Sequence, residues 1–311
     1  MNKIAIIDMG TNTFHLLVAA IGPHGYQVIH RDHEAAKIGM AGINEGFISE
    51  SAARRALAAM WKFRQTIDRF GVRKVYAFGT SAFRNATNAL TLAAEIKTLT
   101  GISVRILSGE EEADYIFEGV SAAISMDAGT SLVMDIGAGS VEFIIGSEGK
   151  LSWKQSFEIG GQRLLEKFQK HDPILSDEIQ ALDLYFEKML GPLLDALEKF
   201  KPGVLIGSSG TFDTLSDIYC IRQGITRTFD VPEAPLSPEG FYEIYQELIR
   251  KSRDARLQIE GMIEMRVDMI VVSCCLIRFL LEKNCFNRIR VSSYSLKEGV
   301  LSKLASDNKR K

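Results

Sequence analysis

Two stretches of the chain share one arrangement of apolar and polar residues, and the first of them lies near the N-terminus. Residues 4–7 form a short apolar run that leads to Asp8, residues 10–13 are small and polar with a leading glycine, and residues 14–18 are largely apolar again. Short apolar runs on both sides of turn-forming residues predict two strands joined by a tight turn. The pattern therefore predicts a β-hairpin with a carboxylate near the end of its first strand.

The second stretch repeats this arrangement far along the chain. Residues 132–134 are apolar, Asp135 follows, residues 137–140 read Gly-Ala-Gly-Ser, and residues 141–145 are apolar except for one glutamate. Recurrence of one supersecondary unit at distant points indicates an internally duplicated chain. We therefore predict an α/β fold of two related domains that face each other across a cleft, with one hairpin contributed by each domain.

Apolar residues at helical spacing account for much of the remaining chain. Over residues 53–70 this spacing predicts a helix whose cap is Ser49 or Ser51. Further helices are predicted over residues 88–100, 108–125, 178–200, 241–251 and 266–283, and that over 178–200 is expected to be one long helix. The strands expected between them cover residues 26–29, 74–79, 104–107, 151–157, 204–206 and 288–291.

A short polar segment, residues 127–129, predicts the boundary between the two domains. The first domain is then expected over residues 1–126 and the second over residues 127–311, with a final helix near 295–305 that packs back on the first domain. Within the second domain, three prolines predict a stiff exposed connection. They are Pro232, Pro235 and Pro238.

Composition is typical of a soluble globular protein. The 311 residues exceed most single cores, and a formal net charge of −2 argues against nucleic acid or an anionic membrane as a partner. The four cysteines follow neither a disulfide framework nor a metal-binding spacing, so we expect a reduced cytoplasmic location. The longest apolar segment, residues 269–281, is too short to span a membrane. The helix that contains it forms either core or the face of a homodimer, and the sequence leaves both open.

Glycine-containing turns after apolar strands predict phosphate binding. Glycine lets successive backbone N–H groups converge without obstruction by side chains, and such groups bind phosphate oxygens. A third small-residue loop, residues 207–211, follows a predicted strand and begins a helix, whose N-terminus attracts anions. The residues predicted to bind phosphate in the three loops are Gly10, Thr11, Asn12, Thr13, Gly137, Ala138, Gly139, Ser140, Gly210 and Thr211.

Carboxylates beside the two hairpin turns predict a divalent cation. Asp135 and Glu142 flank the second turn and offer hard oxygen ligands, and Asp8 stands at the matching place before the first turn. We therefore predict that a cation bridging to the phosphate is held by acids among these three, and the sequence does not decide which.

Two strand-to-helix junctions carry the remaining candidate residues. At the first, Arg84 follows a predicted strand closely, where open α/β sheets place ligand contacts. At the second, three acids occupy residues 110–112, and Ser108 with Glu111 matches a capping box, which gives Glu111 a structural explanation. Consecutive helical residues point about 100° apart, so the three acids face different directions and must be considered one at a time.

In chain order, these pieces resemble the exopolyphosphatase and guanosine pentaphosphate phosphohydrolase family of the actin-like ATPase superfamily. The resemblance implies two ribonuclease-H-like domains with the active site in the cleft between them. Six ordered motifs carry it over nearly the whole chain: DMGTNTFH at 8–15, GTSAFR at 79–84, SGEEEA at 108–113, DIGAGSVE at 135–142, GSSGT at 207–211 and LKEGVL at 296–301.

The resemblance also implies a reaction and the residues that perform it. Family members release the terminal phosphate of inorganic polyphosphate, or the 5′ γ-phosphate of guanosine pentaphosphate, with Mg²⁺; the residues do not decide between the two substrates. By position, the family's catalytic glutamate falls on Glu112 and its basic phosphate anchor on Arg84. Its metal-linked acids fall on Asp135 and Glu142, and its phosphate loops on the two hairpin turns.

Three positions depart from the family's usual residues. Ala138 replaces a middle glycine, Val141 replaces a threonine, and Lys297 replaces an arginine near the C-terminus. Lysine keeps the charge of arginine but loses its bidentate geometry. None of these changes removes a residue that the resemblance links to catalysis.

The expected mechanism is metal-assisted, in-line attack of water on the terminal phosphorus. Glu112 orients the water, and Arg84 binds non-bridging oxygens. Two other functions stay open. An actin-fold ATPase or kinase shares the paired hairpins, but it needs an adenosine pocket and gives Glu112 no equivalent role. A non-catalytic sensor of guanosine pentaphosphate would have no use for Glu112, Asp135 and Glu142 together.

Overall fold

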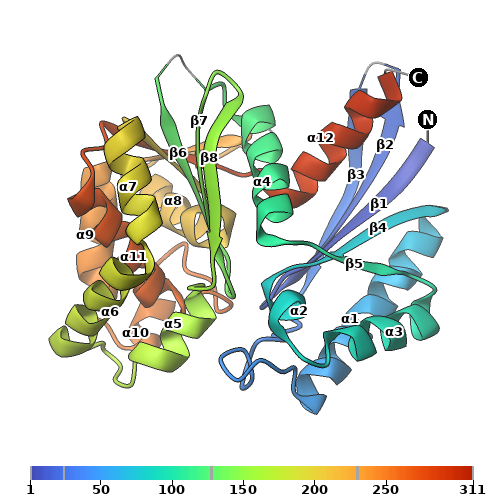
Figure 1. Ribbon diagram of the computed structural model, residues 1–311, viewed down its shortest axis with the longest axis horizontal. Coiled ribbons are helices and arrows are strands. Elements are labelled where there is room, and N and C mark those ends of the chain that lie inside the picture. The colour runs from blue at the N-terminus through green and yellow to red at the C-terminus, as the bar shows by residue number, and fades with distance from the viewer. Residues whose placement is uncertain (1, 24, 127–128, 229–230, 310–311) are drawn as a thin grey trace. The chain divides into compact units, whose positions relative to one another are not determined.

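The computed structural model describes residues 2–23, 25–126, 129–228 and 231–309, and the chain divides into two compact units (Figure 1). Unit 1 comprises Met1–Gly119 and Leu296–Lys311, and unit 2 comprises Val120–Ser295. The division falls after residue 119, within one helix. The predicted boundary lies further along the chain, after residue 126. Of the linker predicted there, Asp127 and Ala128 lie outside the described residues.

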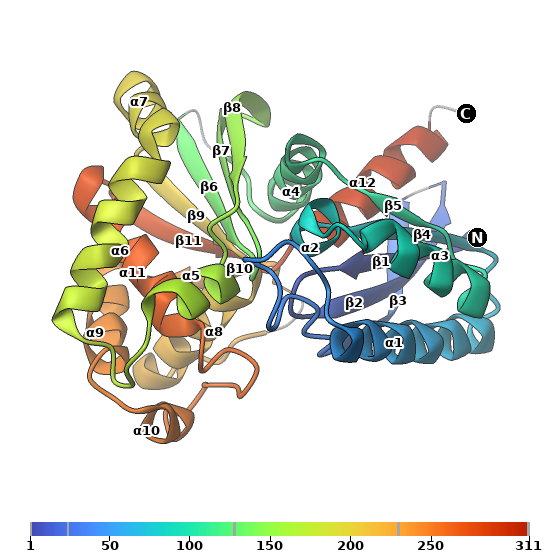
Figure 2. The same cartoon turned by 60° about the horizontal axis from the view of Figure 1, so that its bottom comes forward.

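Unit 1 is built on a five-stranded sheet in the order β3-β2-β1-β4-β5. The first three strands form an antiparallel meander, and β4 and β5 continue parallel to β1. Helices α1 and α3 cover one face of this sheet, and α4 and α12 lie on the other (Figure 2). The elements of this unit are β1 (Asn2–Met9), β2 (Phe14–Gly22), β3 (Gly25–Glu34), α1 (Glu50–Arg69), β4 (Lys74–Gly79), α2 (Ser81–Asn85), α3 (Ala89–Thr100), β5 (Val104–Ile106), α4 (Gly109–Ala123) and α12 (Leu296–Lys309).

Unit 2 contains a six-stranded sheet in the order β10-β11-β9-β6-β7-β8. Here too an antiparallel meander, β6-β7-β8, is extended by parallel strands, β9 and β11, and β10 is an additional antiparallel edge. The elements are β6 (Ser131–Ile136), β7 (Val141–Ser147), β8 (Lys150–Phe157), α5 (Gly161–Phe168), α6 (Ser176–Met189), α7 (Gly191–Phe200), β9 (Val204–Ser208), α8 (Ser209–Gln223), β10 (Glu233–Leu236), α9 (Pro238–Leu248), α10 (Arg253–Leu257), α11 (Ile270–Lys283) and β11 (Arg288–Ser292).

The two predicted hairpins have the same geometry, which confirms the duplication. In the first, the Gly10 N–H donates to the Thr13 carbonyl oxygen at 3.1 Å, and in the second the Gly137 N–H donates to that of Ser140 at 3.0 Å. A Cβ atom on either glycine would lie 2.9 Å from the accepting oxygen. Each turn therefore excludes a side chain at its first residue.

Side-chain alternation in β6 and β7 separates the core of unit 2 from its acids. Leu132 and Met134 point into the apolar core with Phe143 of the neighbouring strand, and all three are fully buried. Burial of each such side chain contributes about 1.5–3 kcal/mol. Because successive residues of a strand point to opposite faces, Asp135 and Glu142 lie on the face opposite this core. The apolar positions thus hold the strands that carry the acids.

Helix 178–200, predicted as continuous, is two helices in the structure. Helix α6 ends at Met189 and α7 begins at Gly191, with Pro192 in its first turn. Proline has no N–H to donate and clashes with the preceding helical turn, but both defects are harmless at a helix start. The prediction of one helix was wrong because Pro192 starts a new helix, although the apolar spacing continues through it.

The proline-rich connection is also more regular than predicted. Pro235 lies in edge strand β10, where Ala234 and Leu236 are buried, and Pro238 begins α9. A strand at the edge of a sheet tolerates proline because one side of its backbone needs no hydrogen-bonded partner.

No helix within the described residues has both the length and the apolar content needed to cross a membrane.

Candidate active site

The structure separates the three acids at the start of α4. Glu110 is exposed, Glu111 is half-buried, and Glu112 keeps only 7% of its surface exposed. The Ser108 N–H donates to Glu111 Oε2 at 3.0 Å, and the Glu111 N–H donates to Ser108 Oγ at 3.1 Å, so the predicted capping box is confirmed. The Ser108 N–H lowers the pKa of Glu111, against the effect of burial and with support from Arg105. Glu111 is therefore explained by the helix cap, and the catalytic role of Glu112 stays a prediction.

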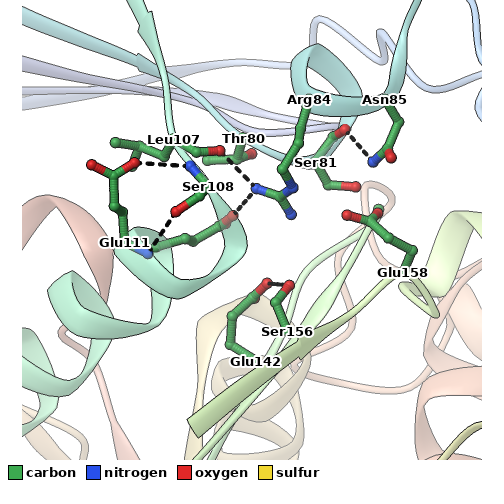
Figure 3. A network of polar contacts seen from close by, with 12 residues as sticks. Thr80, Ser81, Arg84, Asn85, Leu107, Ser108, Glu111, Glu142, Ser156 and Glu158 are labelled. Atoms are coloured by element: carbon green, nitrogen blue, oxygen red, sulfur yellow. Dashed lines mark hydrogen bonds and ion pairs between the residues drawn. The ribbon is translucent and has the colours of Figure 1, made fainter.

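Glu112 forms an ion pair with Arg84 inside unit 1. Arg84 Nη1 lies 2.8 Å from Glu112 Oε2 and also donates to the Leu107 carbonyl oxygen at 3.1 Å (Figure 3). The Arg84 side chain is 18% exposed and that of Glu112 is 9% exposed. Removal of one member of a buried ion pair typically costs about 3–5 kcal/mol, because the other charge loses its partner. Arg84 and Glu112, which were predicted as site residues from two separate strand-to-helix junctions, thus contact each other in the fold.

The first hairpin turn is buried and held by the loop that follows β3. Thr11, Asn12 and Thr13 are each at most 7% exposed. The Gly39 N–H donates to the Thr11 carbonyl oxygen at 3.0 Å, and the Lys37 N–H donates to that of Asn12 at 2.8 Å. Thr11 Oγ1 is buried and makes no hydrogen bond within the described residues. Burial of a hydroxyl without a hydrogen-bonded partner costs about 1–3 kcal/mol of stability. A ligand oxygen that accepted a hydrogen bond from the Thr11 hydroxyl would recover this cost.

The second turn is held by the N-terminus of α5. The N–H groups of Gly161, Gln162 and Gly160 donate to the carbonyl oxygens of residues 137, 138 and 139 at 3.0, 2.8 and 3.2 Å, respectively. Arg163 Nε adds a hydrogen bond of 2.8 Å to the carbonyl oxygen of residue 139. The backbone carbonyl oxygens of residues 137, 138 and 139 thus all accept hydrogen bonds from residues 160–163 at the start of α5, which holds the turn in place.

The alanine in this turn is accommodated without strain. Ala138 stands where the resemblance leads one to expect glycine, and it is not among the described residues with a positive φ angle. Its Cβ atom therefore meets no conformational penalty in the turn.

Asp135 and Glu142 are paired across β6 and β7 and are both buried. Asp135 accepts hydrogen bonds from Ser209 Oγ to Oδ1 at 2.7 Å and from Ser295 Oγ to Oδ2 at 2.6 Å. Glu142 Oε1 accepts one from Ser156 Oγ at 2.6 Å (Figure 3). Serine hydroxyls thus fix the orientation of both carboxylates.

This pair of carboxylates fits Mg²⁺. No cluster of three or more His, Cys, Asp or Glu side chains in the described part of the chain is placed to hold a metal by itself. Mg²⁺ usually keeps several waters and binds through one or two carboxylates together with phosphate oxygens. Asp135 and Glu142 would supply the carboxylates beside a turn that is predicted to bind phosphate. Asp8 lies in unit 1, opposite His15 in the β1–β2 pair, and its metal role stays a prediction.

The third predicted loop contacts an arginine that was not predicted as a site residue. The Arg266 guanidinium lies so close to Gly210 that a Cβ there would be 2.1 Å from Nη2. Burial lowers the pKa of Arg266, and the charges of Asp213 and Asp135 oppose this effect. Its Nε atom is buried and has no hydrogen-bonded partner within the described residues. Together with the start of α8 at Ser209, this group suits an anion.

Comparison with known proteins decides the family. The profile of the Ppx/GppA phosphatase family matches residues 17–307, which is most of the chain. The chain belongs to the Ppx/GppA phosphatase family. It is 26% identical to exopolyphosphatase 2 of Mycobacterium tuberculosis over 321 aligned positions, which cover 98% of this chain and 99% of that protein.

Solved structures of the Ppx/GppA family share the fold. An exopolyphosphatase from Cytophaga hutchinsonii is 43% identical and superimposes with a TM-score of 0.96 over 98% of both chains. The Aquifex aeolicus member is 23% identical, with a TM-score of 0.81 over 99% of both chains. The predicted α/β fold of two ribonuclease-H-like domains is confirmed.

Sequence motifs found some of the polar groups of this Ppx/GppA family member and missed others. Ser209 lies within the GSSGT motif, but the sequence predicts a phosphate contact only for its neighbours Gly210 and Thr211. Ser156 and Ser295 stand in no recognisable pattern, and Arg266 precedes an apolar helix without any motif of its own. Their contacts with the loops and acids depend on the folded chain.

Proposed function

We propose that the protein is an exopolyphosphatase-type phosphohydrolase that releases terminal orthophosphate from inorganic polyphosphate. The observation that carries this proposal is the buried Glu112 carboxylate, paired with Arg84 at the start of α4. A buried acid beside a guanidinium supplies a proton acceptor and a phosphate-binding cation a few ångströms apart. Names of family relatives, exopolyphosphatase among them, support the same reaction.

In the proposed reaction, Glu112 orients a water molecule and accepts its proton. The water oxygen forms a bond to the terminal phosphorus while the bond to the bridging oxygen breaks. The bridging oxygen leaves on the shortened polymer, and orthophosphate is the second product. Arg84 binds non-bridging oxygens and stabilises the negative charge that develops on them.

The hairpin turns and the start of α8 are proposed to bind the phosphate chain. Their evidence is separate for each unit. In unit 1 it is the Thr11 hydroxyl, which has no hydrogen-bonded partner in the described part of the chain, and in unit 2 it is the turn held by α5 together with Arg266. Asp135 and Glu142 would hold Mg²⁺, which would supply Lewis-acid neutralisation of phosphate charge. In unit 1, Asp8 is proposed as a metal ligand only from its place before the first hairpin turn. The serines that hold Asp135 and Glu142 keep the carboxylate oxygens oriented for this purpose.

Guanosine pentaphosphate ends in the same kind of phosphoanhydride, so the 5′ γ-phosphate of that nucleotide is a second proposed substrate. One preparation should be assayed for phosphate release from polyphosphate, guanosine pentaphosphate and ATP, each with Mg²⁺ and with a chelator. We expect release from polyphosphate that depends on Mg²⁺ and exceeds release from ATP.

Each other outcome has a meaning. Release from ATP alone would replace the proposal with an ATPase or kinase. Tight binding of guanosine pentaphosphate without hydrolysis of any substrate would indicate a sensor.

A further inference from the structure

Unit 1 contains a pocket that lies apart from the proposed active-site residues and has no function assigned above. Helices α4 and α12 cross at close range, since a Cβ atom on Gly299 would lie 1.7 Å from the Tyr115 carbonyl oxygen. Past this crossing α12 runs away from α4 (Figure 1). A cavity of about 270 Å³ is left over β4 and β5, bordered by Tyr115 of α4 and by Lys303 and Asp307 of α12. Its volume is near the lower end of those that hold small organic ligands.

One side of the pocket is aromatic. Tyr76 and Phe78 are two positions apart on β4 and therefore point to the same face of the sheet. The Phe78 and Tyr115 rings lie 5.8 Å apart between centroids. Phe78 is buried, whereas Tyr76 and Tyr115 are only half-buried and line the cavity. Planar groups stack on such rings whatever the identity of the base.

The other side of the pocket is cationic. Lys303 Nζ lies 5.4 Å from the centroid of the Tyr115 ring, and Arg105 of β5 also borders the cavity. Arg105 forms an ion pair with Glu111, and Asp307 is the acid in the lining. Two cations beside aromatic rings favour a ligand that combines a flat ring with an anionic group. Asp307 adds an acceptor for ligand hydroxyl groups.

We propose that this pocket binds a small aromatic anion of the nucleoside monophosphate class, with the base against Tyr76 and Tyr115 and the phosphate near Lys303 and Arg105. The site belongs wholly to unit 1 and does not depend on the proposed hydrolase reaction. It includes none of the residues assigned to the hairpin turns or to catalysis. Because Arg105 also pairs with Glu111, a bound phosphate would compete for a cation that faces the first turn of α4.

The test is calorimetric titration of the full chain with AMP and UMP. Adenosine, which lacks the phosphate, and ribose 5-phosphate, which lacks the base, are the matched ligands. We expect both nucleotides to bind and each partial ligand to bind at least about tenfold more weakly, since each loses one of the two contacts. Absence of nucleotide binding, or equal binding of ribose 5-phosphate, would overturn the proposal.

Two lysine variants locate the binding. Lys303 is exposed on α12, where glutamine is a good helix former, so Lys303→Gln should fold normally. Lys74→Gln is the matched control, because Lys74 also lies over a tyrosine ring, that of Tyr76, but does not line the cavity. We expect Lys303→Gln to weaken AMP binding about tenfold and Lys74→Gln to leave it unchanged. Undiminished binding by Lys303→Gln would place the nucleotide elsewhere and refute this site.

Discussion

Ser209 combines an unfavourable backbone with a useful side chain. Its φ angle is +72°, in the left-handed region, and its hydroxyl donates to Asp135 at 2.7 Å. The left-handed conformation costs a residue other than glycine about 1–2 kcal/mol. A hydrogen bond to a charged group contributes about 1.5–3 kcal/mol, so the two effects nearly cancel. The serine is therefore better explained by the orientation of Asp135 than by stability.

Substitution of Ser209 by glycine separates these two effects. Glycine accepts the left-handed backbone but cannot hold Asp135. We expect the free energy of unfolding of Ser209→Gly to stay within about 1 kcal/mol of wild type, and the rate of phosphate release to fall at least about tenfold. Denaturant unfolding and steady-state kinetics measure the two quantities. Unchanged turnover would show that the contact between Ser209 and Asp135 has no part in the reaction.

At the scale of elements, the start of α5 is the support of the second hairpin turn. Gly160 packs so closely that a Cβ atom would lie 2.4 Å from the carbonyl carbon of Ala138. Gly160→Ala must therefore displace α5 or the turn, and overpacking of this kind typically costs about 1–3 kcal/mol. We expect lower stability and a higher KM for polyphosphate.

Gly191→Ala is the control for that variant. Gly191 begins α7, and a Cβ atom there would meet no atom within 4 Å in the described residues apart from its chain neighbours. Gly191 starts the helix and precedes Pro192, and a proline disfavours the helical backbone at the residue before it, so no gain in stability is expected. Gly191→Ala should lose less stability than Gly160→Ala and leave the KM for polyphosphate unchanged. If both variants behaved alike, close packing of α5 on the turn would not be the cause.

The capping box of α4 predicts a pH dependence. Hydrogen bonding to the Ser108 N–H lowers the pKa of Glu111 in the folded state, so this group stabilises the fold at neutral pH. The contribution is full above the ordinary glutamate pKa of about 4.3 and is lost as pH falls through the lower folded value. Glu111→Gln keeps a cap but cannot ionise.

The difference in unfolding free energy between wild type and Glu111→Gln should therefore reach at most about 1 kcal/mol at pH 7 and disappear in acid. Denaturant titrations at several pH values measure it. A difference that grew as the pH fell would contradict the assignment of Glu111 to the helix cap.

Elements were predicted well wherever local pattern decides them. The capping box at Ser108, the cap of α1 and both hairpins depend on neighbours within a few residues, and all were confirmed. Of the two candidate caps, Ser49 and Ser51, the structure has Ser49. The break at Pro192 and the edge strand at Pro235 were missed because apolar spacing and a proline gave opposite indications there. The effect of a proline depends on its position within an element, and apolar spacing does not reveal where that element begins or ends.

At the scale of the whole molecule, the sequence predicts the internal duplication but does not predict the long-range polar contacts. The repeated Asp-x-Gly pattern around Asp8 and Asp135 predicted two related domains, and the two sheets share the same meander with parallel extensions. Ser295 reaches Asp135 across 160 positions of sequence, and Ser209 reaches it across 74. Contacts of this range depend on how the strands assemble, so no local pattern reveals them.

The central claim is that Glu112, and neither of its two acidic neighbours, acts on the attacking water. Glu112→Gln keeps the size and removes the base, whereas Glu110→Gln makes the same change at an exposed position of the same helical turn. Steady-state phosphate release from polyphosphate should fall about 100-fold or more in kcat for Glu112→Gln with KM nearly unchanged, and Glu110→Gln should match wild type. Full turnover by Glu112→Gln would contradict the account.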